Sequence, residues 1–174
     1  SSVYAATTSI RRALRQDDSR PGELLLREGS MLRLDSQLEV WCDARELEKH
    51  WALPQRDSLL SLYRGPFLQG CYLDWAVRLR HQWEERMLQA LQELAARQLE
   101  LEPRQTLETA GQGLDIDPLR QELHALKIRA YLALGQPEAG LRHFQLCEKL
   151  LRQALGLEPL TSLLELYHRC RLAL

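Results

Sequence analysis

Residues 62–70 read LYRGPFLQG, a break inside a sequence that is otherwise rich in helical patterns. Pro66 disfavours helical geometry at the residue before it and cannot donate a backbone hydrogen bond, and the preceding glycine can adopt the left-handed conformation in which helices end. We therefore expect a helix to end near Arg64. Phe67 and Leu68 follow at once. Because a hydrophobic pair in a loop is costly unless it packs, we predict that both side chains are buried between that helix and the next.

Helical patterns lie on both sides of this break. Before it, the sequence predicts helices over residues 43–51, with Asp43 as a cap, and over residues 55–63. After it, a helix of roughly 28 residues is expected to begin near Leu73 and to end before the proline at position 103. Its apolar stripe consists of Leu73, Val77, Trp83, Met87, Leu91, Leu94 and Leu101. Further helices are expected at about residues 104–113, 118–134, 137–155 and 160–172.

The last helices contain a repeat. Pro103 and Pro137 are 34 residues apart, which is the period of tetratricopeptide repeats, each built from two antiparallel helices. In the clearer copy, the positions that this repeat fills with small or aromatic residues are Tyr131, Gly135, Gly140, Phe144 and Cys147. The other copy is degenerate. The predicted fold class is mainly α, with a tetratricopeptide-like helical array.

The first 35 residues have a different organisation. Residues 1–16 form an amphipathic helical pattern with one stripe of apolar residues, and residues 17–22 are turn formers. Residues 23–27 and 31–34 read as two strands of a β-hairpin joined by Glu28, Gly29 and Ser30. The apolar stripe of the helix consists of Val3, Ala6, Ile10, Ala13 and Leu14. One helix and one hairpin cannot enclose a core, so we expect further structure upstream of this segment.

Basic residues gather in this same segment. The whole chain has a net charge of -1, but residues 1–34 carry six arginines against four acidic residues. Arg11, Arg12 and Arg15 lie within five residues of one another, and such a patch can attract phosphate even on a nearly neutral protein. On charge alone, the favoured interpretation is still a surface helix whose arginines are solvated.

Other classes of function find little support in the sequence. No apolar run approaches the ~18 residues of a membrane span, and no secretory signal is present, so a cytoplasmic protein without membrane contact is expected. The four cysteines are far apart, with no C-x-x-C pair, which favours reduced thiols over a zinc site or disulfides. The histidines show no H-E-x-x-H spacing, and no nucleophile elbow is found. We expect no enzyme activity, no metal and no cofactor.

The order of the motifs matches a known family. YRGPFL, the D-P-x-x-x-E pattern that begins at Asp117 and the closing L-G-x-E-P at residues 155–159 resemble the bacterial transcriptional activator domain of antibiotic-regulator type activators, over residues 39–174. In that family the domain follows a winged helix like that of response regulators. Residues 9–14, SIRRAL, resemble its recognition helix, and residues 31–35, MLRLD, resemble the end of its wing. The usual wing ends in Gly-Tyr-x-Leu, whereas residues 30–34 of this chain, SMLRL, lack the Gly-Tyr.

This resemblance implies two domains and a function. Residues 1–35 would be the C-terminal part of a winged-helix DNA-binding domain, and residues 39–174 the activator domain. The apolar face of the first helix would then be buried, and its exposed face would enter the major groove of DNA. Ser2, Tyr4, Ala5 and Thr8 would meet base edges. Arg11, Arg12, Arg15 and Arg27 would meet phosphates, Arg12 being best placed to reach a base as well.

The implied protein is a DNA-binding transcriptional regulator, expected to act as an activator. Its partners would be double-stranded DNA, RNA polymerase or another regulatory protein, and a second copy of the chain. The alternative is a helical-repeat module that holds another protein and does not bind DNA, an interpretation that the missing Gly-Tyr of the wing favours.

Overall fold

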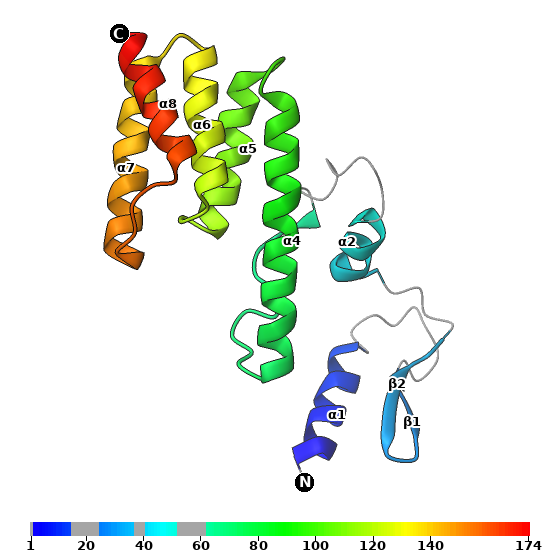
Figure 1. Ribbon diagram of the computed structural model, residues 1–174. Helices are drawn as coiled ribbons and strands as arrows, with labels where there is room; N and C mark the ends of the chain where they lie inside the picture. The colour runs from blue at the N-terminus through cyan, green and yellow to red at the C-terminus, as the bar shows by residue number, and fades with distance from the viewer. Residues whose placement is uncertain (1, 15–24, 37–40, 52–61) are drawn as a thin grey trace. The chain divides into compact units, whose positions relative to one another are not determined.

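The protein is described by a computed structural model over most of its length, in the ranges 2–14, 25–36, 41–51 and 62–174. The chain divides into two compact units, Ser1–Glu46 and Leu47–Leu174, which we call the amino-terminal unit and the carboxy-terminal unit. In the described ranges the chain is mainly α-helical, with one two-stranded β-sheet (Figure 1). This confirms the expected fold class of a mainly α chain with a small β-hairpin. None of the helices in these ranges is both long enough and apolar enough to cross a membrane.

The amino-terminal unit contains helix α1 (Ser2–Leu14) and the antiparallel strands β1 (Leu25–Glu28) and β2 (Met31–Leu34). Glu28 pairs with Met31, so it belongs to the strand and the loop is only Gly29 and Ser30. The φ angle of Gly29 is +62°, and glycine with a positive φ is what a type II′ turn requires at the first position of a two-residue loop. The predicted hairpin is therefore confirmed, with a tip one residue shorter than expected.

The apolar stripe of α1 is exposed where its side chains are described. Ala6 is exposed, and 47% of the surface of Ile10 is accessible. The described residues thus leave these two side chains uncovered, and burial of this face in a winged-helix core stays a prediction. The physical reason for their exposure is that one helix and a two-stranded hairpin provide too few layers to cover a helix face. The side chains of Val3, Ala13 and Leu14 lie outside the described residues.

Helices build the carboxy-terminal unit, and those from α4 onward are joined by short turns. Helix α2 crosses the division between the units. Two predicted ranges, 43–51 and 137–155, agree with the observed bounds, and the helix predicted over 55–63 lies almost wholly outside the described residues. The helices are α2 (Asp43–Trp51), α4 (Asp74–Gln98), α5 (Pro103–Ile116), α6 (Gln121–Ala133), α7 (Pro137–Leu155) and α8 (Thr161–Leu172).

The long helix α4 is shorter than predicted at its C-terminal end. Leu73 precedes it and Leu101 follows it, and their exposed fractions are 59% and 87%. The expected apolar stripe is therefore wrong at its two ends, because these leucines lie outside the helix whose period was used to place them. Its centre is confirmed, since Trp83 and Met87 are buried.

The start of α6 also differs from the prediction. The carboxylate of Asp117 accepts a hydrogen bond from the backbone N–H of Leu119 at 2.9 Å, and the carbonyl of Asp117 accepts one from the N–H of Arg120 at 3.3 Å. An aspartate that bonds two residues ahead favours a turn over a helix. The helix consequently begins at Gln121 and not at Pro118.

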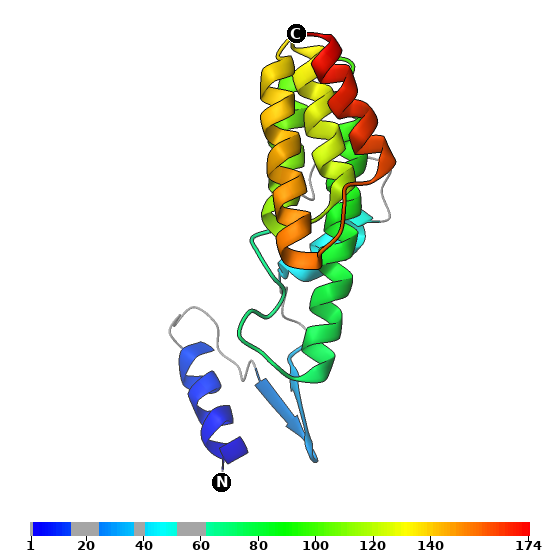
Figure 2. The same cartoon turned by 60° about the vertical axis from the view of Figure 1, so that its left-hand side comes forward.

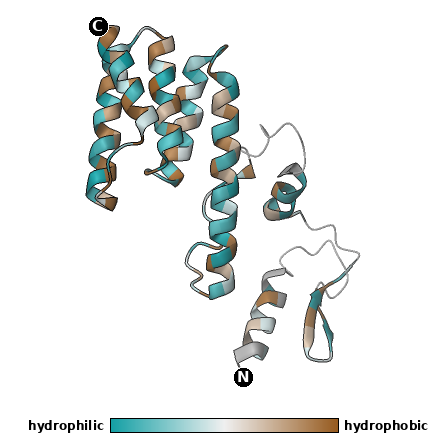
Figure 3. Ribbon diagram, in the orientation of Figure 1, coloured by the Kyte–Doolittle hydropathy of each residue, from teal (hydrophilic) through white to brown (hydrophobic). Residues whose placement is uncertain are grey.

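Consecutive helices of the carboxy-terminal unit pack side by side (Figures 1 and 2). Each of α4, α5, α6 and α7 contacts the next helix in the chain, and α6 also contacts α4 and α8, so α6 is the centre of the array. Figure 3 shows apolar and polar residues interspersed along these helices. One buried cluster, among α4, α5 and α6, consists of Leu88, Ala95, Ala110, Leu123 and Leu126. A second, among α6, α7 and α8, consists of Ala125, Ile128, Phe144, Cys147, Leu151, Leu163, Leu166 and Cys170.

The 34-residue offset found in the sequence has structural counterparts. Pro103 and Pro137 each stand in the first turn of a helix, α5 and α7. A Cβ atom at Gly140 would lie 2.8 Å from Sγ of Cys170, so glycine allows α7 to approach α8 closely. These features are compatible with tetratricopeptide-like helix pairs. The pairs at this offset in which both members are buried include Thr106 with Gly140, Ala110 with Phe144, and Gly113 with Cys147.

A single arginine holds the turn formed by the LYRGPFLQG stretch. Nε of Arg80, on α4, donates a hydrogen bond to the carbonyl oxygen of Phe67 at 2.8 Å. Nη2 of the same side chain donates to the carbonyl oxygens of Leu68 at 2.6 Å and Cys71 at 2.9 Å. Phe67 is half-buried, and its ring stacks on that of Trp83 with 5.4 Å between centroids. The turn is thus tied to α4 through both its backbone and Phe67.

Leu68 contradicts the prediction made for this turn. It is 44% exposed, and its φ angle of 47° lies in the left-handed region that a branched side chain rarely adopts. The prediction that both apolar side chains are buried is wrong for Leu68 and holds only partly for Phe67. Because Arg80 draws several carbonyl oxygens of the turn toward α4, it stabilises this backbone conformation, in which the Leu68 side chain is left exposed.

Candidate functional site

Four of the residues predicted to contact DNA form one exposed face of α1. Tyr4, Thr8 and Arg12 are spaced by four residues and Ala5 precedes Thr8 by three, so the geometry of a helix places them side by side. Tyr4 is 76% exposed, and the other three are also exposed. The helix contains two arginines and no acidic residue. This face is therefore accessible and basic.

The hydroxyl group of Thr8 is partly engaged within α1. Its Oγ1 donates a hydrogen bond to the carbonyl oxygen of Tyr4 at 2.9 Å. The hydroxyl proton is thus used, whereas the oxygen lone pairs and the methyl group are not. A side chain in this state can accept a hydrogen bond from a base amino group or contact a thymine methyl group.

The other residues predicted to contact DNA are not found on this face of α1 in the described structure. The side chains of Ser2 and Arg11, and the whole of Arg15, lie outside the described residues. Arg27 is exposed on β1, and its Nε donates a hydrogen bond to the carbonyl oxygen of Gly29 at 3.1 Å. This bond orients the guanidinium group toward the tip of the hairpin, where its terminal nitrogens remain available to an acceptor.

A second arginine of the hairpin was missed by the sequence interpretation. Arg33 lies opposite Leu26 in the strand register. Because alternate residues of a strand face opposite sides, Arg33 and Arg27 lie on opposite faces of the hairpin. Its Nη2 lies 2.6 Å from Oε1 of Glu28, and both side chains are about half exposed. The period of two along the strands could have identified it, because alternate residues face opposite sides. The ion pair neutralises Arg33, so the two faces of the hairpin differ in charge.

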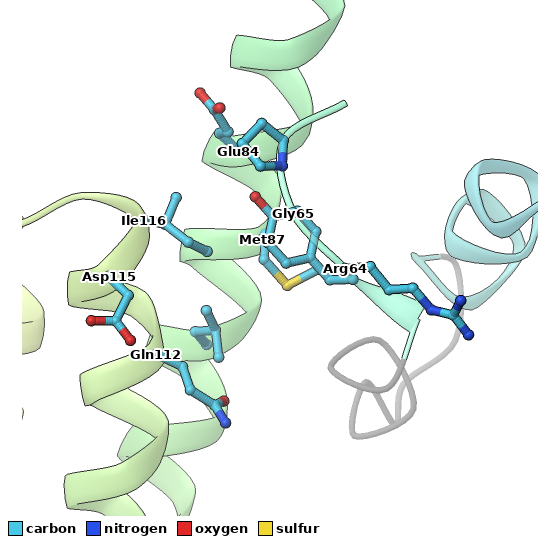
Figure 4. Close-up of a pocket in the computed structure, with 10 residues that line it drawn as sticks. Arg64, Gly65, Glu84, Met87, Gln112, Asp115 and Ile116 are labelled. Carbon is cyan, nitrogen blue, oxygen red and sulfur yellow. The ribbon is translucent and has the colours of Figure 1, made fainter. Parts of the chain in front are cut away.

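The carboxy-terminal unit contains a cavity next to the LYRGPFLQG turn. Its volume is about 450 Å³, and Figure 4 shows it between the segment at residues 63–66 and the helices α4 and α5. Apolar side chains and a few polar groups form its walls. The lining residues are Tyr63, Arg64, Gly65, Pro66, Glu84, Met87, Leu91, Gln112, Asp115 and Ile116.

Comparison with known proteins places the helical array in a family. The family model described as the bacterial transcriptional activator domain matches residues 39–171. The chain belongs to this family. The resemblance found through YRGPFL and the later motifs is thereby confirmed, and the chain is assigned to a family of transcription regulation. No curated protein and no solved structure matches the chain.

The matched range of the activator domain covers α2 and the helices from α4 onward. It begins after β2 ends at Leu34, so every residue predicted to contact DNA precedes it. The cavity lies entirely inside it. Membership of the family therefore describes the helical array, whereas a role for α1 and the hairpin has to be argued from their own residues.

Two histidines form a buried polar contact in the activator domain. Nδ1 of His124, on α6, lies 3.0 Å from Nε2 of His143, on α7, and Nε2 of His124 lies 2.9 Å from the carbonyl oxygen of Pro118. A carbonyl can only accept, so Nε2 of His124 carries the proton and His143 donates to Nδ1 when both rings are neutral. Burial lowers the pKa of both rings, that of His143 to about 3. Both are therefore neutral near pH 7.

All four cysteines are free thiols. Cys147 and Cys170 are buried in the cluster among α6, α7 and α8, whereas Cys42 and Cys71 are only half-buried. Burial raises the pKa of the Cys147 thiol to about 11, so it is an uncharged packing residue. In the described part of the chain, no group of three or more His, Cys, Asp or Glu side chains could hold a metal ion.

Proposed function

We propose that this protein is a DNA-binding transcriptional regulator, acting as an activator. In this proposal residues 1–35 are the C-terminal part of a winged helix, with α1 as the recognition helix and the β1–β2 hairpin as the wing. Residues 39–174 form the activator domain, which contacts RNA polymerase or a second copy of the chain. The observation that carries the proposal is the exposed face of α1, where Tyr4, Thr8 and Arg12 stand in line without an acidic residue.

The electrostatics of α1 support this role. Phosphate contacts dominate the affinity of proteins for DNA and require cationic side chains that can reach the backbone. Arg12 is exposed and carries no acidic neighbour in its own helix. Positions near the start of a recognition helix read base edges in the major groove. Tyr4, Ala5 and Thr8 occupy such positions, and Ser2 and Arg11 are proposed to join them.

A salt titration tests the proposal. The affinity of the intact protein for duplex DNA would be measured between about 50 and 200 mM salt for the wild type, Arg12→Ala and the triple variant Arg11→Ala/Arg12→Ala/Arg15→Ala. We expect the slope of log affinity against log salt to lose about 0.9 for each phosphate contact removed. Arg104→Ala, which removes an exposed arginine at the start of α5, is the matched control and should leave the slope unchanged. An affinity for DNA that does not depend on the salt concentration, or that is unchanged in the triple variant, would exclude the DNA role.

The hairpin favours a second candidate function, a helical module that binds proteins and not DNA. Residues 30–34 lack the Gly-Tyr of the family's wing, and the charge of Arg33 is neutralised by Glu28. This leaves one unpaired guanidinium, that of Arg27, on the described hairpin. An intact protein that binds purified RNA polymerase or itself, but shows no affinity for duplex DNA at about 50 mM salt, would favour this candidate.

A further inference from the structure

The cavity next to the LYRGPFLQG turn has an apolar floor. Met87 and Leu91 of α4 border it, but their exposed fractions of 0% and 1% leave no surface for an occupant to contact. The accessible apolar surface comes from Tyr63, Pro66 and Ile116. Ile116 of α5 faces the same space and is half-buried (Figure 4). A volume of about 450 Å³ lies within the range of pockets that hold small organic molecules.

The polar groups of the cavity are mainly negative. Glu84 lies on α4, and Asp115 and Gln112 lie on α5 (Figure 4). Neither Asp115 nor Gln112 has a hydrogen-bond or ion-pair partner within 4 Å among the described residues. Asp115 also stands in the last turn of α5, which contains no basic residue, and the carbonyl end of a helix is negative. A carboxylate in that place is destabilised unless a cation approaches it.

The cations near the cavity leave these carboxylates available. Figure 4 shows the guanidinium of Arg64 directed away from Asp115 and Gln112. Lys127 on α6 interacts with Asp115 electrostatically, but no ion pair within 4 Å joins them in the described chain. His81 lies 3.5 Å from Glu84 and carries a charge only when it is protonated. The cavity therefore combines an apolar floor with a negative rim.

The Tyr63 hydroxyl adds a neutral donor to this rim. Burial, and then the nearby charge of Glu84, raise the pKa of Tyr63 above its ordinary value, so the phenol remains protonated at neutral pH. A neutral phenol can donate to or accept from a ligand, and its ring presents an electron-rich face to a cation.

We propose that this cavity binds a small organic cation, whose amine or guanidine head lies at the acidic rim and whose apolar body packs on Tyr63, Pro66 and Ile116. The negative rim favours a cationic head group, and the apolar floor favours an apolar body of the ligand. This site is part of the activator domain and does not depend on whether α1 binds DNA. Its test measures ligand binding directly, so the outcome is separate from that of the DNA titration.

A matched series of three probes tests the charge preference. Phenethylammonium, phenylethanol and hydrocinnamate share one aromatic body and carry a positive, a neutral and a negative head. Each would be titrated into the isotope-labelled intact protein while the backbone amide signals of Gly65, Gln112 and Ile116 are followed by NMR. For ligands of this size we expect a dissociation constant on the order of millimolar for phenethylammonium. Phenylethanol should bind at least about 5-fold more weakly, and hydrocinnamate more weakly still.

Charge-removing variants locate the site. Asp115→Asn and Glu84→Gln keep the shape of each side chain, and each should reduce the affinity for phenethylammonium about 3- to 10-fold while leaving that for phenylethanol unchanged. Glu108→Gln removes the same charge from an exposed position of α5 outside the cavity and should leave both affinities unchanged. Equal binding of the three probes, or an undiminished preference for the cation in the double variant Glu84→Gln/Asp115→Asn, would overturn the proposal. The amide spectrum of each variant reports whether it is folded.

Discussion

The two units of the chain differ in how much apolar surface they enclose. In the carboxy-terminal unit, Met87, Leu123 and Ile128 have no accessible surface, whereas in the amino-terminal unit Ile10 is 47% exposed and Met31 is 70% exposed. A single helix and a two-stranded hairpin are only marginally stable in water on their own. The helices of the carboxy-terminal unit are therefore stabilised by a core of their own. The exposed residues of α1 and the hairpin contribute less to stability and are available for contacts.

Truncating matched side chains in the two units should give the largest contrast. Phe144 is 4% exposed and its ring packs on that of Tyr167 at 4.9 Å between centroids. Phe144→Ala should lower the free energy of unfolding by about 3–5 kcal/mol, through lost burial and the cavity left behind. Ile10→Ala should lower it by less than about 1 kcal/mol, because half of that side chain is already in water. Urea denaturation of the intact chain, followed by circular dichroism, measures both. Equal losses would contradict the contrast.

The histidine pair makes the stability of the carboxy-terminal unit depend on pH. The pKa of His143 is lowered to about 3 by burial, then by His124 and Lys127, and that of His124 is lowered mainly by burial. Below about pH 6.5 the unfolded chain takes up protons that the folded chain does not, so the free energy of unfolding falls as the pH falls. The slope should be about 1.4 kcal/mol per pH unit for each histidine that stays neutral.

Replacing one histidine should isolate this effect. His143→Gln keeps an N–H that can donate to Nδ1 of His124 but does not titrate. Between about pH 6.5 and 5, its free energy of unfolding should fall by about 2 kcal/mol less than that of the wild type. His168→Gln, an exposed histidine on α8, is the control and should follow the wild type. Parallel curves for all three proteins would show that the pair does not resist protonation.

The Arg80 contacts of the LYRGPFLQG turn should have the next largest effect. Lysine at this position keeps the charge. It cannot reproduce the planar guanidinium group that donates hydrogen bonds to the carbonyl oxygens of Phe67, Leu68 and Cys71. Arg80→Lys should therefore cost about 2 kcal/mol of unfolding free energy. Arg78→Lys, an exposed position on the same helix, should cost less than about 0.5 kcal/mol. If the two variants unfold at the same urea concentration, the turn is not held by Arg80.

This turn also shows how far the sequence determines the structure. The Gly-Pro pair correctly marked a break in helix, and the Phe67 and Trp83 contact is the packing that an apolar residue after a break predicts. Leu68 could not be placed, because its exposure depends on a left-handed backbone that Arg80 stabilises from twelve residues away. Tertiary hydrogen bonds of this kind leave no local pattern.

The candidate sites divide in the same way. Helical spacing was enough to align Tyr4, Thr8 and Arg12 on one face, because that geometry is local. The neutralisation of Arg33 by Glu28 requires the strand register, which is set by the length of the turn at Gly29 and Ser30. The cavity between α4 and α5 requires the packing of segments far apart in sequence, and LYRGPFLQG therefore looked like a structural joint and not like the wall of a binding site.

The smallest effect on stability is expected at the Glu28 and Arg33 pair. Both side chains are about half exposed, and exposed ion pairs contribute less than about 1 kcal/mol. Glu28→Gln should therefore change the free energy of unfolding by less than about 0.5 kcal/mol. If the hairpin is a DNA-contacting wing, the same change frees Arg33 for phosphate and removes a repulsive charge. The affinity for duplex DNA should then rise severalfold, and the salt slope should steepen by up to about 0.9.

A matched pair in the other unit provides the control for this last comparison. Glu138 and Arg142 of α7 form an exposed ion pair at 3.9 Å, so Glu138→Gln alters the net charge of the chain equally without touching the hairpin. It should leave the affinity for duplex DNA unchanged at every salt concentration. An equal rise in both variants would mean that DNA responds only to the net charge of the chain. A rise with Glu28→Gln alone assigns the contact to the hairpin, because the two variants differ only in where the charge is removed.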